Sequence, residues 1–308
     1  ILPDVPGVRL PGVFVLREAE DAIRLRTWSQ MGSQMGSQTE SQTRHREAVV
    51  VGGGVLGVEA ASALVDLGLR VTILHQGDRL MNRHLDARAA AILERFLTGK
   101  GVELRTGATV DRLLGKDKLE AVRLADGSVI DAQLCVVCIG VEPNITLARA
   151  AGLRTQAGIV VDGEMRTSRA DIFAIGDAAE PSSQVTGLWT LGAEHAERAV
   201  AAMFGRTPVL AATPHALHLK IPGIDVRAFG QVEASGPHQV EHVDPEATDN
   251  EHRKLVVENG RLVGAVFAGP PGSARMFGAI LTDPSASIPF GATPSAGGET
   301  TSLDGSLP

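Results

Sequence analysis

The sequence predicts an α/β protein with a doubly wound domain that contains an antiparallel meander, followed by a separate α+β domain. Two observations predict this class. An apolar strand, a Gly-rich turn, a helix and a second apolar strand follow one another from Glu47 to His75, which is the order of a βαβ unit. Short apolar runs between turn residues then dominate the stretches 102–139 and 215–268, as is typical of antiparallel strands.

The first half of the chain alternates extended and helical patterns. Its Pro- and Gly-rich opening favours an extended segment, and a short helical pattern follows. The glycines lie between an apolar strand and a helix. The expected elements are an extended segment at 2–14, helices at 17–26, 55–67 and 86–98, and strands at 48–53, 69–75, 102–104, 109–114, 119–124, 129–130 and 134–139.

The second half begins with a few short elements and ends in a meander. Apolar runs predict its strands, and a longer pattern that starts near Leu191 predicts a helix. The expected elements are strands at 159–161 and 172–175, a helix at 191–204, strands at 215–221, 225–229, 239–242, 253–258 and 262–268, and a helix at 274–281.

A four-residue repeat interrupts this order. From Ser29 the chain reads SQMG, SQMG, SQTE, SQTR, with no apolar periodicity beyond Met31 and Met35. Such a segment cannot bury a face, so it predicts a mobile linker. A partner-docking segment built on the two methionines is the alternative.

The composition excludes several classes of function. The formal net charge is −7, and the aromatic residues are eight Phe and two Trp, with no Tyr. This disfavours a nucleic-acid binder, which needs a basic face or stacking rings. Two cysteines cannot form a disulfide framework, and no apolar run approaches the roughly 20 residues of a membrane span. We therefore expect a cytoplasmic protein with neither a nucleic-acid nor a membrane partner.

The glycine-rich turn carries the clearest functional signal. Gly52, Gly54 and Gly57 form G-x-G-x-x-G directly after a strand and at the start of a helix. Gly52 permits the tight turn, Gly54 lets a pyrophosphate approach the backbone, and Gly57 lets the helix pack closely on the strand. The helix N-terminus adds amide donors for the phosphates. We expect dinucleotide binding here, with a merely structural turn as the alternative.

The end of the second strand is where a carboxylate would accept hydrogen bonds from the adenine ribose of NAD. His75 occupies this position. A neutral imidazole accepts one bond, whereas a cationic one tolerates a 2′-phosphate. Arg79 and Arg83 could favour that phosphate, but both could equally be solvated side chains. The choice between NAD and NADP therefore stays open.

The cysteines and histidines predict neither a redox disulfide nor a metal site. Cys135 and Cys138 form C-x-x-C inside an apolar strand. Residues three apart on a strand point to opposite faces, so we expect two buried thiols rather than a bridge. His215 and His218 lie in a strand-like run and would also face opposite ways, so no metal site is expected.

Four stretches together resemble the FAD-dependent pyridine nucleotide-disulfide oxidoreductases: VVVGGGVLGVEAA, VTILHQGDRLMNRHLD, IGVEPN and GIVVDGEMRTSRADIFAIGDAAE. The stretch from His75 to Asp86 is similar to the flavoprotein part of NADH nitrite reductase large subunits, whose second strand also ends in His. The resemblance covers residues 1–285 except the SQ repeat. It implies a flavoprotein architecture with two dinucleotide-binding domains, and FAD and NAD(P)H as cofactors.

The resemblance also implies roles for residues on the nicotinamide side. Glu59, in the extension of the glycine motif, would lie near the nicotinamide and the flavin ring. Gly140 and Asn144 of IGVEPN would belong to the loop that borders the nicotinamide. No side chain is expected to act as a nucleophile, because the cofactors carry the chemistry.

On the flavin side, Gly176 and Asp177 correspond to the second FAD fingerprint of this family. There the Asp carboxylate would accept a hydrogen bond from a ribityl hydroxyl. The next helix, beginning near Thr190, would direct its N-terminus at the flavin edge where negative charge develops on reduction. A helix cap or turn residue is the alternative role for Asp177.

The chain departs from the family in having one dinucleotide loop instead of two. We therefore expect it to lack the N-terminal, ADP-binding half of the FAD domain. The resemblance then divides the chain into a crossover remnant of the FAD domain (1–28), the SQ-repeat linker (29–46), an NAD(P)-binding domain (47–141), the C-terminal part of the FAD domain (142–205), an α+β domain (206–285) and a disordered tail (286–308).

The expected function is an NAD(P)H:acceptor oxidoreductase that passes electrons through FAD to an acceptor such as a ferredoxin, a rubredoxin or an iron-sulfur or sirohaem partner. The α+β unit resembles the third domain of this family, which often forms the subunit interface, so the resemblance implies a homodimer. The cysteine clusters that nitrite reductases carry for iron-sulfur and sirohaem centres are missing, so nitrite reduction itself is not expected on this chain. Two alternatives remain: a non-catalytic NAD(P)-binding or partner-docking module, and an ordinary Rossmann dehydrogenase.

Overall fold

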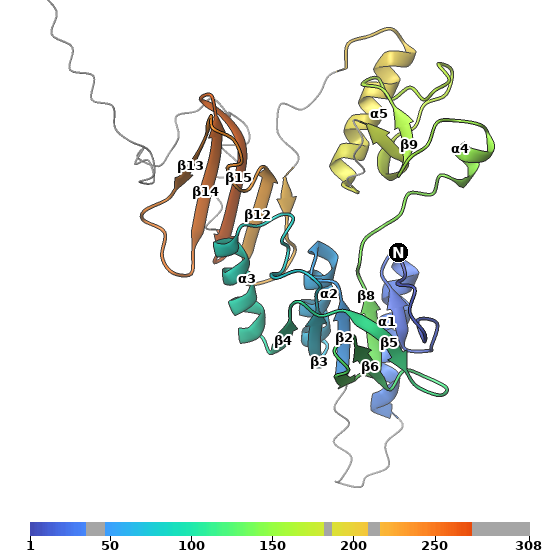
Figure 1. The fold of residues 1–308 in the computed structure, drawn as a ribbon, viewed down its shortest axis with the longest axis vertical. Helices are drawn as coiled ribbons and strands as arrows, with labels where there is room; N and C mark the ends of the chain where they lie inside the picture. Colours follow the sequence, from blue (N-terminus) through green and yellow to red (C-terminus); the bar gives the residue numbers. More distant parts are fainter. Residues whose placement is uncertain (35–46, 182–186, 209–215, 273–308) are drawn as a thin grey trace, which may run out of the picture. The chain divides into compact units, whose positions relative to one another are not determined.

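The computed structural model describes residues 1–34, 47–181, 187–208 and 216–272 (Figure 1). The chain divides into two compact units. The first unit comprises residues 1–82 and 94–215, and the second comprises residues 83–93 and 216–308. The division falls within a single helix, α3 (Ala87–Gly99).

A five-stranded parallel sheet is the centre of the first unit. Its strand order is β1-β8-β2-β3-β4, and every neighbouring pair is parallel. Val49, Ile73 and Val136 are fully buried within it, which explains why these strands read as continuous apolar runs. The helix α2 (Val55–Asp66) packs along β2 and β3. The strands are β1 (Val13–Val15), β2 (Glu47–Val51), β3 (Arg70–Leu74), β4 (Val102–Arg105) and β8 (Leu134–Val137).

The predicted meander forms a three-stranded antiparallel sheet in the first unit, in the order β5-β6-β7. The chain's opening segment lies along this sheet, because the amide of Leu113 donates to Pro6 and that of Leu119 to Pro11. Leu119 and Val122 are fully buried in the core that the sheet shares with β2 and β8. The strands are β5 (Val110–Leu114), β6 (Ala121–Leu124) and β7 (Val129–Asp131).

Helix α1 (Ala19–Gln34) is longer than the sequence pattern predicted. It continues past Arg26 into the SQ repeat, so the expectation of a linker that starts at residue 29 was wrong for Ser29 to Gln34. The reason is tertiary: the Trp28 indole donates to the carbonyl of Gln133 at 3.1 Å, and Ser29 is buried. The rest of the repeat, with its proposed docking role, lies outside the described residues.

The last part of the first unit contains β9 (Ile159–Val161), β10 (Ala179–Pro181), a short helix α4 (Thr146–Ala150) and α5 (Trp189–Met203). The strand predicted at 172–175 does not form. Phe173 makes only an isolated bridge with Arg166, because the chain turns at Met165, whose φ is +66°. A 3₁₀ turn (Gly176–Ala178) follows, and β10 pairs with β9 instead.

The second unit is built on a five-stranded antiparallel sheet in the order β11-β12-β15-β14-β13. Phe229, Leu255 and Phe267 form a core cluster in it. The first strand is shorter than predicted, and the predicted helix at 274–281 and the tail lie outside the described residues. The strands are β11 (Leu217–His218), β12 (Asp225–Gly230), β13 (Gln239–Val243), β14 (His252–Glu258) and β15 (Arg261–Gly269).

A buried polar cluster lies in the second unit, where α3 begins. Asp86 caps the helix by accepting from the amide of Ala89 at 3.0 Å. Its other carboxylate oxygen lies 2.8 Å from Nε2 of His252 and 2.7 Å from Nζ of Lys254, both on β14. Burial alone would raise the pKa of Asp86, but the hydrogen bonds from His252 and Lys254 outweigh burial and hold the pKa far below its usual range.

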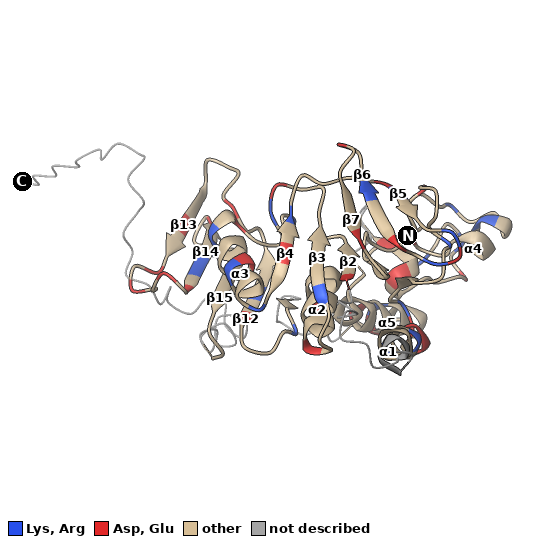
Figure 2. Cartoon of the chain, turned by 90° about the horizontal axis from the view of Figure 1, so that it is seen from below, with Lys and Arg blue, Asp and Glu red and all other residues tan. Residues whose placement is uncertain are grey.

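Charged residues are distributed over both units. Figure 2 shows basic and acidic residues interspersed along the described strands and loops of each unit. Among the described helices, none is long and apolar enough to cross a lipid bilayer. The predicted fold class, a parallel α/β sheet with an antiparallel meander and a separate C-terminal domain, is confirmed.

Candidate functional site: a dinucleotide loop and a flavin-type turn

Two of the three motif glycines are required by the local geometry of the loop after β2. Gly52 has a φ of +113°, and a β-carbon there would overlap the carbonyl of Cys138. A β-carbon at Gly57 would overlap the carbonyl oxygen of Gly52. The first turn of α2 therefore packs directly on the end of β2, and larger residues would force the two elements apart.

Gly54 is different, because its α-carbon faces open space. A β-carbon built on it meets no protein atom within 4 Å, and its φ of −82° and ψ of −173° suit any residue. It is the N-cap of α2, and no side chain in the described part of the chain caps that helix. An anion can therefore approach the N-terminus of α2, because Gly54 has no side chain that would block its path. Glu59 follows on α2 and is half-buried.

His75 lies against this loop. The backbone amide of Gly53 donates to Nδ1 of His75 at 3.2 Å. The carbonyl of Gly53 accepts from the amide of Met81 at 2.8 Å. The backbone N–H and the carbonyl of Gly53 therefore both hydrogen-bond to the segment after β3, which holds that segment against the glycine loop.

The arginines considered for a 2′-phosphate lie in different settings. Nη1 of Arg79 is 3.3 Å from the carboxylate of Asp78, and the Arg79 side chain is mostly buried. Arg83 belongs to the second unit. Of the two arginines, Arg79 is the one in the same unit as His75. Its positive charge is paired with the carboxylate of Asp78.

The IGVEPN loop leaves the sheet beside the glycine loop. The amide of Cys138 donates to Val51 at 2.7 Å, so the loop begins at the carboxyl end of β2. Gly140 follows with a φ of +114°. The side-chain oxygen of Asn144 accepts from the amide of Thr146 at 3.4 Å, at the start of α4. The structure therefore brings Gly140 to the edge that carries the glycine loop, whereas the Asn144 side chain is engaged at the start of α4.

Gly176 and Asp177 form the 3₁₀ turn near the N-terminus of α5. Gly176 has a φ of +66°, and a β-carbon at Gly192, in the first turn of α5, would lie 3.4 Å from its α-carbon. Among the residues that the structure describes, no side chain caps α5. The carboxylate of Asp177 thus stands on a tight turn beside an uncapped helix N-terminus, and the helix begins at Trp189, next to the expected Thr190.

Sequence reasoning missed one residue of this turn. Nη2 of Arg17 lies 3.1 Å from Oδ2 of Asp177. Arg17 follows β1, and its own amide is fixed by a 2.9 Å bond to Oδ2 of Asp21 on α1. The available signal was the position of Arg17 two residues after a strand of the parallel sheet, at the carboxyl edge where ligands bind in such folds.

Both cysteines are unbridged, and their surroundings disfavour the thiolate form. Both are free, with Cys135 buried and Cys138 half-buried. Burial raises the pKa of each thiol to about 12, so the reactive thiolate is scarce. The prediction that the two thiols are unbridged is confirmed, whereas the expected full burial holds for Cys135 and not for Cys138. Among the described residues there is also no group of three metal-ligating side chains; His218 lies 3.6 Å from Asp225, and His215 is outside those residues.

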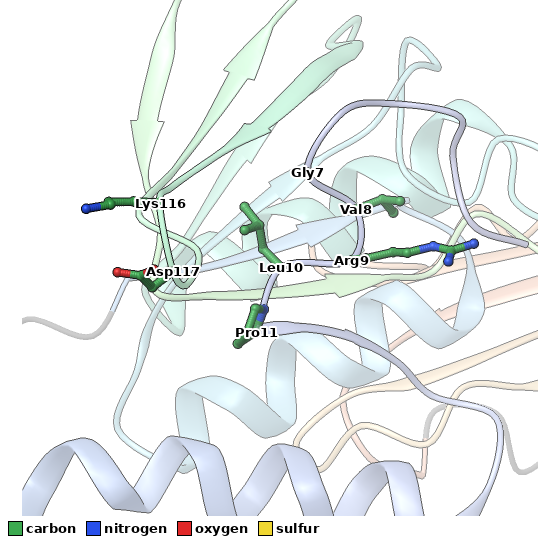
Figure 3. Close-up of a pocket in the computed structure, with 7 residues that line it drawn as sticks. All are labelled: Gly7, Val8, Arg9, Leu10, Pro11, Lys116 and Asp117. Atoms are coloured by element: carbon green, nitrogen blue, oxygen red, sulfur yellow. The ribbon is translucent and has the colours of Figure 1, made fainter.

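A hollow that none of these residues lines lies between the chain's opening segment and the turn that joins β5 to β6 (Figure 3). Leu10 and Pro11 line it, while the side chains of Arg9 and Lys116 extend in opposite directions. Its two cationic groups do not converge, so this hollow is poorly suited to a pyrophosphate.

The parallel sheet and the two glycine-bearing turns are typical of nucleotide-binding proteins, and comparison with known proteins identifies the family. Residues 1–203 match the family model "Pyridine nucleotide-disulphide oxidoreductase", and residues 216–282 match the "Rubredoxin NAD+ reductase C-terminal domain". The chain belongs to the pyridine nucleotide-disulphide oxidoreductase family, as the resemblance predicted. Members of this family are FAD-dependent and use NAD(P)H.

Three relatives illustrate the range of the family. The chain is 31% identical over 282 residues to a nitrite reductase [NAD(P)H] of Bacillus subtilis, covering 91% of this chain and 33% of that protein. It is 38% identical over 176 residues to the ferredoxin–NAD(+) reductase subunit of a benzene 1,2-dioxygenase system from Pseudomonas putida, covering 57% of this chain and 40% of that protein. A solved complex of putidaredoxin reductase with putidaredoxin matches with a TM-score of 0.73 and 26% identity, covering 89% of this chain and 64% of the matched chain. The chain thus spans about a third of the length of the nitrite reductase.

Proposed function

We propose that this chain binds NAD(P)H at the glycine loop and passes electrons through FAD to a small iron-sulfur protein. The open α-carbon of Gly54 at the uncapped N-terminus of α2 carries the proposal. A pyrophosphate needs close approach to backbone amides, and the side-chain-free surface of Gly54 permits it. When bound, the two cofactors supply the hydride chemistry, so the protein's task is to bind, orient and shield them.

Each element of the loop has a part in this task. Gly52 and Gly57 keep α2 close to β2, so that the helix N-terminus points at the carboxyl edge of the sheet. Gly140 begins the neighbouring loop, which would border the nicotinamide. Glu59 on α2 and the Asn144 segment would lie near the same ring, as the family resemblance implies.

The flavin side rests on Asp177 and its surroundings. The carboxylate is held on a tight turn by Gly176 and by Arg17 at 3.1 Å, which suits hydrogen bonds from a row of hydroxyls. The uncapped N-terminus of α5 offers amide donors for the electron-rich edge of the isoalloxazine. These residues fit the ribityl and flavin parts of FAD.

The second domain and the relatives support a choice of acceptor. The match of residues 216–282 to a rubredoxin reductase domain and the relationship to ferredoxin reductases support a ferredoxin or rubredoxin as acceptor. A homodimer assembled through this domain is a further part of the proposal. Sedimentation of the purified chain would test it directly.

A second candidate function has one observation in its favour: the sequence carries one G-x-G-x-x-G loop, so the pyrophosphate of FAD has no such loop of its own. In that case the chain binds NAD(P)H without turnover, as a nucleotide-binding or docking module. Titration of the purified chain with FAD, followed by NADH without oxygen, separates the two. Flavin binding followed by bleaching of its visible absorbance supports the oxidoreductase, whereas NADH binding with no retained flavin supports the module.

A further inference from the structure

The inference concerns His75. This residue lies directly after β3, where dinucleotide-binding domains commonly carry a carboxylate that binds the adenine ribose. Its backbone is fixed on the β4 side, because its amide donates to Arg105 and its carbonyl accepts from Ala108, both at 2.9 Å. The ring therefore projects from a rigid strand end. The position of the His75 α-carbon relative to the glycine loop is therefore set by the sheet.

The ring nitrogen nearest the loop is already used by the protein. Nδ1 accepts the backbone N–H of Gly53 at 3.2 Å. A nitrogen that accepts an N–H carries no proton, so a neutral ring in this arrangement has its hydrogen on Nε2 and is a donor there. His75 consequently has no accepting atom left for the two ribose hydroxyls.

The other ring nitrogen is covered by the protein. Nε2 is buried and has no hydrogen-bond partner among the described residues. A β-carbon at Gly77 would lie 2.8 Å from Nε2 and 2.6 Å from the side-chain nitrogen of Asn82. The segment after His75 therefore folds back over the ring, and only glycine at 77 leaves room for this.

Gly53 is the residue that this arrangement holds. Its N–H donates to His75 and its carbonyl accepts from Met81 at 2.8 Å. A β-carbon on Gly53 would lie 2.5 Å from Leu80 and 2.8 Å from Cγ of His75. Since Gly53 lies between Gly52 and Gly54, its peptide orientation decides how the rest of the loop is presented.

We propose that His75 is a positioning residue for the dinucleotide loop: its Nδ1 fixes the Gly53 peptide and thereby holds Gly54 and the N-terminus of α2 in the geometry that receives a pyrophosphate. It does not read the ribose. The proposal deepens the proposed function and rests on NAD(P)H binding at this loop. NADH and NADPH have the same pyrophosphate, and His75 acts on the part of the loop that binds it. His75 therefore contributes equally to the binding of both nucleotides.

Two isosteric variants distinguish the two nitrogens. In His75→Asn the side-chain oxygen can occupy the place of Nδ1 and accept from Gly53, whereas in His75→Gln the polar group reaches the place of Nε2. Dissociation constants for NADH and NADPH are measured by calorimetry on the full chain. We expect His75→Gln to weaken both cofactors by about tenfold, the effect of one lost hydrogen bond, and His75→Asn to stay within about threefold of wild type.

A cofactor-free measurement separates this proposal from the proposed function. Hydrogen exchange of the Gly53 amide should be slow in the wild type and in His75→Asn, and faster in His75→Gln. If the wild type binds neither nucleotide, the proposed function fails while this readout still tests the hydrogen bond. Equal exchange in all three proteins, better retention of binding by His75→Gln than by His75→Asn, or a changed ratio of NADH to NADPH affinity would overturn the positioning role.

Discussion

The guanidinium of Arg17 lies 3.1 Å from the carboxylate of Asp177, although 160 positions separate them in the chain. The two side chains are 61% and 37% exposed, so the pair adds little to stability. Its consequence is geometric: the acidic group is oriented on its turn by a residue that follows β1. A pair that stabilises weakly but orients a carboxylate is suited to a ligand site.

The first prediction tests this pair. Asp177→Asn removes the charge and half of the accepting capacity of the turn, so FAD affinity should fall by about tenfold, while the NAD(P)H affinity stays unchanged. Flavin fluorescence titration measures the first and calorimetry the second. Asp171→Asn is the matched control, because Asp171 also pairs with an arginine, at 3.5 Å, on an exposed surface. Equal losses in both variants would remove Asp177 from the site.

The second prediction contrasts two glycines of one motif. Gly54→Ala adds a methyl group that meets no protein atom within 4 Å, so the fold should keep its melting temperature. The same methyl group would occupy the space of the pyrophosphate, and NAD(P)H affinity should fall by about tenfold or more. Calorimetry with NADH and NADPH checks this expectation.

Gly57→Ala is the counterpart. Its β-carbon would overlap the carbonyl of Gly52, so α2 must shift away from β2 at a cost of about 1–3 kcal/mol. We expect a lower melting temperature even without nucleotide, as read by circular dichroism. Unchanged nucleotide affinity in Gly54→Ala, with the fold intact, would show that the pyrophosphate does not approach this α-carbon.

The third prediction concerns Asp86 in the second unit. Its side chain is 8% exposed and those of His252 and Lys254 are 3% and 5% exposed. Asp86→Asn leaves the buried Lys254 without this carboxylate, so the free energy of unfolding should fall by about 3–5 kcal/mol at neutral pH. Asp117→Asn, at an exposed turn, is the control and should change it little.

The pH dependence of this difference has a definite sign. The folded-state pKa of Asp86 lies below its unfolded value, so the ionised group contributes stability above about pH 4, and this contribution is lost as the pH falls below that. The gap in unfolding free energy between wild type and Asp86→Asn should therefore be widest at neutral pH and narrow below about pH 4. Denaturant unfolding at several pH values measures it; a gap independent of pH would contradict the ionic role.

The predictable part of the fold is the part that local pattern determines. The strands around Val49, Ile73 and Val136 are buried on both faces, so they appear in the sequence as unbroken apolar runs next to a Gly-rich turn. The antiparallel strands of the second unit appear in the sequence as short apolar runs separated by turn residues, so they could also be predicted. The glycines could be assigned to the loop because a turn, a close approach and a helix start each need a residue without a side chain.

What could not be predicted depends on contacts between distant residues. Helix α1 outlasts its own pattern because Trp28 donates to Gln133, which no helical periodicity reveals. The run at 172–175 looks like a strand, but Met165 turns the chain so that Phe173 forms only one bridge. At the site, the sequence predicts that His75 lies at the end of a strand. It does not reveal that Nδ1 of His75 accepts the amide of Gly53, because this contact depends on how the neighbouring loop folds.

The fourth prediction addresses the thiols beside the site. Cys138 packs under the glycine loop, where a β-carbon at Gly57 would lie 3.5 Å from its own. Because burial raises the pKa of Cys135 and Cys138 to about 12, alkylation of the native protein at pH 8 should be far slower than that of the unfolded chain. Mass spectrometry after timed treatment with iodoacetamide measures both rates. Since the electrons need no disulfide in the proposed route, Cys138→Ala should retain NAD(P)H binding and any flavin reduction by NADH. Rapid native alkylation, or loss of flavin reduction in Cys138→Ala with nucleotide binding intact, would instead make this thiol a participant in the electron path.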